Sequence, residues 1–311
     1  MASKSSKKVV YTAIVANLGI AIIKYVAAGI TRSPAMLAEA FHSTGDTGNE
    51  LLLLLGMRRS ARTPDELHPF GHGKALYFYS LLVAVFIFGS GGVLAAHQGI
   101  SRILHPEPPL HAEWNYVVLA AAFFFEGYSW RISRQELMKH RAAGETAWQR
   151  VLRSKDPTIF TIFLEDTAAL IGIAIAFLGI LFGHLFRNPY VDPAASILIS
   201  IILVELAVLL ARESGALLIG ESANPAKIRR MREIIRSDKA VEGVGDLLTM
   251  HLGPEQVLLA VDIKFRSGLN VRELEAAIDR IEERIRQSDP TVHRIFIEAE
   301  SLRRSERRKA A

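Results

Sequence analysis

Two long stretches without charged side chains constrain the fold of this chain more than any other feature. Neither Ala75–Gly99 nor Thr167–Phe186 contains an Asp, Glu, Lys or Arg residue. A helix of roughly 20 apolar residues matches the ~30 Å hydrocarbon core of a bilayer, because each helical residue adds about 1.5 Å. The sequence therefore predicts a protein embedded in a membrane.

Whole-chain averages conceal this feature, because the chain has two unlike parts. Its 311 residues are 50% hydrophobic and 22% charged, which is ordinary for a soluble protein, but the charge is dense after residue 224. We expect a six-span transmembrane transport domain over 1–215, a small α/β domain over 216–300 and a basic tail over 301–311. The absence of cysteine excludes disulfides, thiolate metal sites, Fe–S clusters and a Cys nucleophile.

The first part is predicted to be an all-α bundle of six transmembrane helices. The expected spans are Val9–Ile30, Ala35–Met57, Ala75–Gly99, Glu113–Trp130, Pro157–Leu185 and Pro189–Ala211. The first span follows a lysine-rich start, but Lys24 interrupts it and no clear cleavage site follows, so we interpret it as a retained span and not a signal peptide.

The charges of the connecting loops predict the orientation of the bundle. One set of connections is rich in Lys and Arg: Arg58, Arg59, Arg62, Lys74, Arg131, Arg134, Lys139, Arg141, Arg150, Arg153 and Lys155. The opposite set carries only Arg32, Arg102 and Arg187. Basic loops stay on the cytoplasmic side of a membrane, so we expect both termini in the cytoplasm.

The second part is predicted to be a cytoplasmic αββαβ domain. Asn224 is a good N-cap for a helix with Pro225 at its first position. The remaining expected elements are strands Val241–Met250 and Val257–Phe265 around a Gly253-Pro254 turn, an amphipathic helix Val271–Gln287 and a strand Val292–Ala299.

Polar residues inside the second span are the first candidates for function. His42 and Asp46 are four residues apart, so they stack on one helical face, and Asn49 continues the row. Charged groups are costly in hydrocarbon and usually serve a site in the bundle interior. An imidazole and a carboxylate in this arrangement can bind one divalent metal ion. The alternative is a His–Asp hydrogen bond that only holds helices together.

The fifth span adds a second pair of acids, Glu165 and Asp166. Neighbouring helical residues point ~100° apart, so only one of the two can face squarely into a site shared with the second span. A second span that carries carboxylates favours the metal interpretation, although a structural hydrogen bond remains the alternative.

The loop between the second and third spans holds another candidate site. Asp65, His68 and His72 lie within eight residues, and two imidazoles with one carboxylate can form a partial zinc site. The alternative is a basic loop with incidental histidines.

Together these residues resemble the cation diffusion facilitator family. The resemblance is carried by six spans, His42-Ser-Thr-Gly-Asp46, Asp65/His68/Phe70-Gly-His72-Gly-Lys74 in the following loop, and the αββαβ tail. The sequences around Asp46 and Leu164-Glu-Asp-Thr-Ala-Ala169 are most similar to the branch that includes animal zinc transporter nine. The resemblance implies a homodimer with a ferredoxin-like cytoplasmic domain that exports divalent metal, often zinc, in exchange for protons.

This chain also departs from the family pattern. The family usually has His-x-x-x-Asp in the fifth span, but Ile162 stands at the His position, so only His42, Asp46 and Asp166 carry over. Glu165 is a conceivable replacement ligand. In the tail, Asp262 and Glu298 stand where several members have metal-binding histidines, which argues against a regulatory metal site there.

We therefore expect a multi-pass secondary transporter, not an enzyme, in a bacterial inner membrane. Its partners would be the lipid bilayer, protons and a second copy of the chain, with no nucleic acid and no resident cofactor. Zn2+ is the expected substrate, and an oxygen-rich site also suits Mn2+, Fe2+, Co2+ or Mg2+. The alternatives are a non-transporting metal scaffold or sensor, and a metalloenzyme, for which the chain lacks a His-Glu-x-x-His sequence.

Overall fold

The computed structural model describes residues 4–31, 34–105, 112–139, 144–186 and 188–299. Within these ranges, the side chains of residues 4–5, 31, 34–39, 41–42 and 112–114 lie outside the description, and so does the expected basic tail 301–311. The chain forms two compact units. The helical unit runs to Ala61 and from Ala75 to Gly215; the sheet unit combines Arg62–Lys74 with the chain from Ala216.

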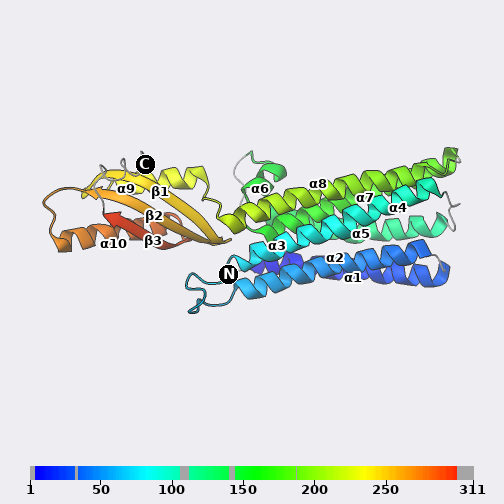
Figure 1. Cartoon of the computed structure of the whole chain (residues 1–311), viewed down its shortest axis with the longest axis horizontal. Coiled ribbons are helices and arrows are strands. Elements are labelled where there is room, and N and C mark those ends of the chain that lie inside the picture. Colours follow the sequence, from blue (N-terminus) through cyan, green and yellow to red (C-terminus); the bar gives the residue numbers. More distant parts are fainter. Residues whose placement is uncertain (1–3, 32–33, 106–111, 140–143, 187, 300–311) are drawn as a thin grey trace. The chain divides into compact units, whose positions relative to one another are not determined.

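Long helices that run alongside one another build the helical unit (Figure 1). They are α1 (Lys4–Thr31), α2 (Pro34–Ser60), α3 (Ala75–Phe86) continued by η1 (Ile87–Val93) and α4 (Leu94–Leu104), α5 (Ala112–Met138), α7 (Pro157–Phe186) and α8 (Val191–Ile219). The predicted bundle is confirmed. In the described part of the chain, Ser6–Ile30, Ala75–Leu104, Pro157–Phe186 and Val191–Ile219 are long and apolar enough to cross a membrane. The less apolar α2 and α5 carry the polar residues discussed below.

Two features of the helical unit differ from the expected spans. The third span contains the π-helical stretch η1, whose sequence Ile-Phe-Gly-Ser-Gly-Gly-Val has three glycines. π-helical turns are rare and often occur at functional places in a helix. A short helix, α6 (Ala147–Arg153), stands where only a loop was expected, and a capping box between Thr146 and Gln149 begins it.

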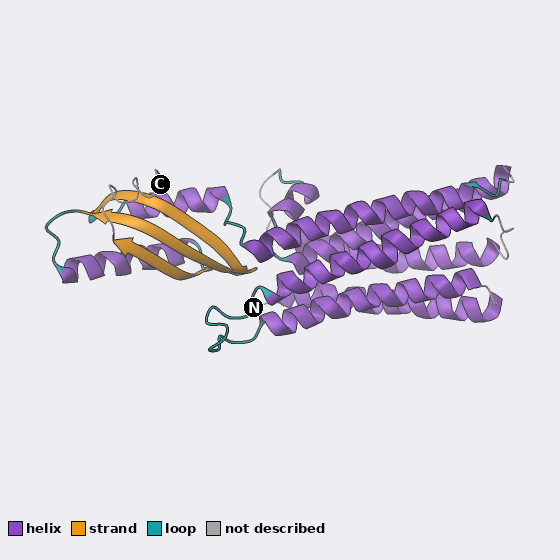
Figure 2. Cartoon of the chain, viewed as in Figure 1, coloured by secondary structure: helices purple, strands orange, loops and turns teal. Residues whose placement is uncertain are grey.

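The sheet unit has the predicted αββαβ order (Figure 2). Its elements are α9 (Pro225–Arg236), β1 (Val241–Gly253), β2 (Gln256–Phe265), α10 (Val271–Ser288) and β3 (Val292–Ala299). β1 and β2 form an antiparallel hairpin, and α10 connects β2 to the parallel strand β3. The Asn224 side chain accepts a hydrogen bond from the Ala226 N–H and caps α9, as the sequence predicts.

One apolar core holds the sheet unit together. Met231 and Ile235 of α9 and Ile281 and Ile285 of α10 pack with alternate residues of β2 such as Leu259. Side chains alternate across a strand, so both helices cover the same face of the sheet.

The loop between α2 and α3 folds as part of the sheet unit. Gly73 lies against the end of β1, where a Cβ would come within 2.2 Å of the Leu252 carbonyl oxygen. The Phe70 ring meets the Phe296 ring edge-on at 6.4 Å. The sequence-based division places this loop in the transport domain; in the structure it packs on the sheet.

Candidate metal sites

The polar residues Asp46, Asn49 and Glu50 of α2 lie inside the helical unit. Asp46 is half-buried, whereas Asn49 and Glu50 are 2% and 1% exposed. Because residues four apart stack on one helical face, Glu50 lies one turn along α2 from Asp46. His42 belongs to α2 as well, but its side chain lies outside the described residues.

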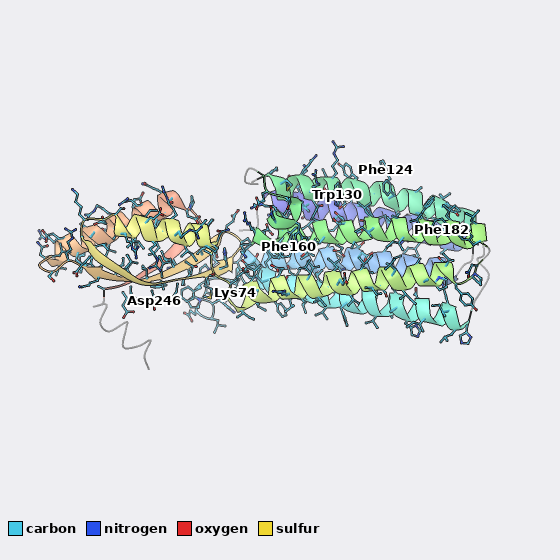
Figure 3. All side chains as sticks on the ribbon, turned by 90° about the horizontal axis from the view of Figure 1, so that it is seen from above. Lys74, Phe124, Trp130, Phe160, Phe182 and Asp246 are labelled. Atoms are coloured by element: carbon cyan, nitrogen blue, oxygen red, sulfur yellow. The ribbon has the colours of Figure 1, made fainter. Side chains whose placement is uncertain are left out.

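Glu165 of α7 faces α2. The Asn49 side chain donates a hydrogen bond from Nδ2 to Glu165 Oε1 at 3.0 Å. α7 runs the length of the helical unit, with Phe160 near one end and Phe182 near the other (Figure 3). The contact therefore places a carboxylate of the fifth span beside the second span within the bundle.

Asp166 faces α5 instead. The Ser129 and Ser133 hydroxyls donate to Asp166 Oδ2 at 3.0 and 3.1 Å. Ile162, one turn earlier on the same face of α7, is 1% exposed. The adjacent acids thus contact different helices, as their ~100° separation requires.

Other charged groups surround these acids. Glu126 of α5 is within electrostatic range of Asp46, Asp166 and Lys24. Lys24 donates a hydrogen bond from Nζ to Ser43 Oγ at 2.8 Å. A set of acids at this depth requires cations or protons to compensate its charge.

Asp65, His68 and His72 form a compact cluster on the loop of the sheet unit. Within the described ranges, they are the one group of three such residues whose ligand atoms all lie within 4.8 Å of one another. Asp65 Oδ1 lies 3.1 Å from His68 Nδ1, and Asp65 Oδ2 lies 3.4 Å from His72 Nε2. Ligands ~2.0–2.2 Å from a tetrahedral zinc ion are about 3.4 Å apart, so this spacing fits such an ion.

The electrostatic surroundings of Asp65 also suit the cluster to binding a cation. Slight desolvation opposes ionisation of Asp65, but hydrogen bonds from His68 and the nearby imidazoles outweigh it and lower the pKa of this carboxyl. Asp65 is therefore ionised at neutral pH, as a metal ligand must be. Gly71 has φ +87°, a left-handed conformation that favours glycine and turns the chain between His68 and His72.

Sequence reasoning missed three polar residues around the membrane acids. Asn17 of α1 donates to Glu50 Oε1 at 2.5 Å, and Ser129 and Ser133 hold Asp166. The signal for the serines was their four-residue spacing, which puts both on one face of α5, but Ser133 lies beyond the predicted end of that span at Trp130. Asn17 gave a weaker signal, a single amide in an apolar span.

Both units of the chain match domains of one known protein family. The cation efflux transmembrane domain matches residues 10–219, and the cytoplasmic domain of cation efflux proteins matches residues 223–302. The chain belongs to the cation diffusion facilitator family. The predicted family and fold are thereby confirmed, and the family is one of transporters.

Relatives in this family include proteins of animals, plants and bacteria. The chain is 33% identical over 287 residues to the mouse (Mus musculus) "Proton-coupled zinc antiporter SLC30A9, mitochondrial", covering 90% of this chain and 51% of the relative. It is 30% identical to "Metal tolerance protein C4" of Arabidopsis thaliana, over 86% of this chain and 59% of the relative. It is 25% identical to "Magnetosome protein MamM" of Paramagnetospirillum magneticum, over 83% of this chain and 77% of the relative. The chain spans about half the length of the animal relatives it matches.

Proposed function

We propose that this protein is a secondary transporter that exports a divalent metal cation, with zinc as substrate, from the cytoplasm in exchange for protons. The observation that carries the proposal is the hydrogen bond from Asn49 to Glu165 inside the bundle, which joins the acid-bearing faces of α2 and α7. The animal relatives named as proton-coupled zinc antiporters support the same chemistry.

The transport site in this proposal consists of His42, Asp46 and Asp166, with Glu165 as a further ligand. Asp46 and Glu165 are within electrostatic range of each other, and Glu165 faces α2. His42 is the proton-coupling group, because an imidazole with an ordinary pKa of ~6.5 binds either a metal ion or a proton near neutral pH. Alternating access would expose the site to each side of the membrane in turn.

The loop cluster of Asp65, His68 and His72 is proposed as a second metal site on the cytoplasmic side, with a structural role or a role in delivering metal. The Lys- and Arg-rich connections support cytoplasmic termini, and a bacterial inner membrane is the proposed location. The cytoplasmic domain is the proposed main contact of a homodimer.

Metal uptake by the purified protein in sealed vesicles tests the proposal. We expect Asp46→Ala to abolish uptake and to leave a folded protein of unchanged size in gel filtration, because it removes a central ligand. Thr47→Ala is the matched control, since within the described ranges the Thr47 hydroxyl donates to the Ser43 carbonyl of the same helix. Near wild-type uptake by Asp46→Ala would remove Asp46 from the site. Binding without accumulation in the wild type would favour the scaffold alternative.

A further inference from the structure

Among the described residues, three buried oxygens of α2 and α7 have no hydrogen-bond partner. They are Asn49 Oδ1, Glu50 Oε2 and Glu165 Oε2. Asn49 and Glu50 are 2% and 1% exposed. An unsatisfied buried acceptor is costly, and a carboxylate oxygen is more costly than a neutral one, so three together indicate a positive partner.

Each of these side chains is held by its other polar atom. Asn17 donates to Glu50 Oε1 at 2.5 Å, and Asn49 donates to Glu165 Oε1 at 3.0 Å. Because Asn49 directs its NH2 group towards Glu165, its carbonyl oxygen is left as the free acceptor. The hydrogen bonds therefore fix three side chains and leave one free acceptor on each.

The free oxygens lie in a region of concentrated negative charge. Glu50 is within electrostatic range of Glu165, Asp46 and Asp166. Lys24 donates a hydrogen bond to Ser43, which lies two helical turns before Glu50 on α2. A cation bound at the free oxygens would both satisfy them and compensate the carboxylates.

We propose that Asn49, Glu50 and Glu165 form an all-oxygen binding position for a divalent cation, one helical turn along α2 from Asp46. The inference rests on the proposed transport function and adds Asn49 and Glu50 to it. Two carboxylate oxygens and one amide carbonyl are hard ligands, so this position prefers Mn2+, Fe2+ or Mg2+ to Zn2+.

The position lies on the side of Asp46 that leads to Arg58 and Arg59, the basic end of α2. Thr161, one turn before Glu165 on the same face of α7, has a buried hydroxyl without a partner in the described part of the chain and continues the row of free oxygens in that direction. A cation that arrives from the basic end meets this position before it meets Asp46.

Glu50→Gln separates metal binding from a purely structural role. The glutamine carbonyl can still accept the hydrogen bond from Asn17, so the packing of α1 against α2 is retained. The substitution removes the negative charge and replaces the free oxygen with an NH2 group, which cannot ligate a cation. Asn49→Leu gives an independent variant, because it keeps the volume of the side chain and removes its carbonyl oxygen.

The experiment is a titration of the purified full chain with Mn2+ alone. Binding is measured as the loss of the free Mn2+ signal in electron paramagnetic resonance. The background variant carries Asp46→Asn, His68→Ala and His72→Ala, which disables the other two proposed sites. We expect one Mn2+ equivalent to bind in this background. Adding Glu50→Gln or Asn49→Leu should weaken that binding at least tenfold. Adding Glu205→Gln, which changes an exposed acid of α8, should not.

Two results would overturn the proposal: no bound Mn2+ in the background, or Mn2+ affinity that neither added substitution changes. Thermal unfolding in detergent identifies any variant that fails to fold, and the other variant then decides. Either negative result leaves the proposed transport function standing, because that function depends on metal uptake by the wild type and its loss in Asp46→Ala.

Discussion

At the scale of single residues, Ile162 is the departure with the clearest chemical consequence. It is 1% exposed and lies one turn before Asp166 on α7. We expect Ile162→His to place an imidazole beside Asp166 and to raise zinc affinity about tenfold, or ~1.4 kcal/mol, over the wild type. Nitrogen ligands favour zinc over manganese. Calorimetric zinc titration in detergent, with manganese as competitor, measures the change.

The control for this substitution is Ile162→Leu, which keeps the side chain apolar and should leave zinc affinity unchanged. Equal zinc affinity in folded Ile162→His and wild-type protein would contradict the expectation. It would mean that this face of α7 does not meet the metal, and would assign the α7 ligand to Glu165, which faces α2.

Asp238 gives the sheet unit a defined dependence on pH. Burial opposes its ionisation, but two hydrogen bonds from Arg280 at 3.2 Å and one from the Ala240 N–H outweigh burial and lower the pKa of Asp238. A lowered folded-state pKa means that the stabilisation is complete above the unfolded value of ~3.9. It is lost as pH falls through the folded value.

We therefore expect Asp238→Asn to reduce the stability of the sheet unit by about 1–2 kcal/mol at pH 7. The difference from wild type should begin to shrink as pH falls below about 4, where the unfolded state takes up a proton, and should vanish below the folded-state pKa, where Asp238 is neutral in both states of the wild type. Hydrogen exchange of α10 amides in the full chain, corrected for intrinsic rates, measures it. Asp279→Asn, an exposed change on the same helix, should have no effect; a gap that persists at low pH would refute the assignment.

At the scale of elements, the contact of η1 with α8 depends on the absence of a side chain at Gly92. A Cβ there would lie 2.6 Å from Val204 Cγ2, and valine is stiff at χ1. We expect Gly92→Ala to destabilise the helical unit by about 1–3 kcal/mol, the usual cost of overpacking. Thermal unfolding in detergent tests this.

Gly89→Ala is the matched control for Gly92→Ala within the same π-helical stretch, because a Cβ at Gly89 meets nothing within 4 Å. It should be neutral or slightly stabilising, since alanine favours helix over glycine. The double variant Gly92→Ala/Val204→Ala should recover most of the lost stability. Equal unfolding temperatures for the two single variants would show that α8 adjusts to the added methyl group.

Local patterns made much of the fold predictable. The strand Val292–Ala299 and the Asn224 cap were found because alternation and capping are encoded by neighbouring residues. The capping box at Thr146 is equally local, and the Thr146-x-x-Gln149 spacing is a signal that predicts the start of α6. The end of α5 at Met138 was missed because hydropathy marks the bilayer and not the end of a helix that continues beyond it.

The candidate site was less predictable, because its geometry depends on contacts between distant segments. The sequence indicated Glu165 and Asp166 but did not decide which of them faces α2. That choice depends on the rotation of α7, which packing against α2 and α5 sets. The free oxygen of Asn49 also becomes evident only once its partner Glu165 is known.

At the scale of the whole molecule, the proposed antiport predicts that a proton gradient drives metal movement. Vesicles with an acidic interior should take up zinc faster than vesicles without a gradient, because protons leaving through the protein exchange for metal entering. An ionophore that dissipates the gradient should remove the acceleration, and Asp46→Ala vesicles serve as the control for leakage. Uptake that is indifferent to the imposed gradient would exclude proton coupling.

Because the loop between α2 and α3 packs on the sheet, the chain enters the sheet unit, returns to the helical unit and enters the sheet unit again. The polypeptide passes between the two units three times, after Ala61, after Lys74 and after Gly215, and not once as in a simple tandem of domains. During synthesis, the ribosome makes this loop and most of the helical unit before it makes the strands against which the loop packs. The loop therefore cannot pack on the sheet until the strands have been synthesised. The Asp65, His68 and His72 cluster reaches its final surroundings only when nearly the whole chain exists.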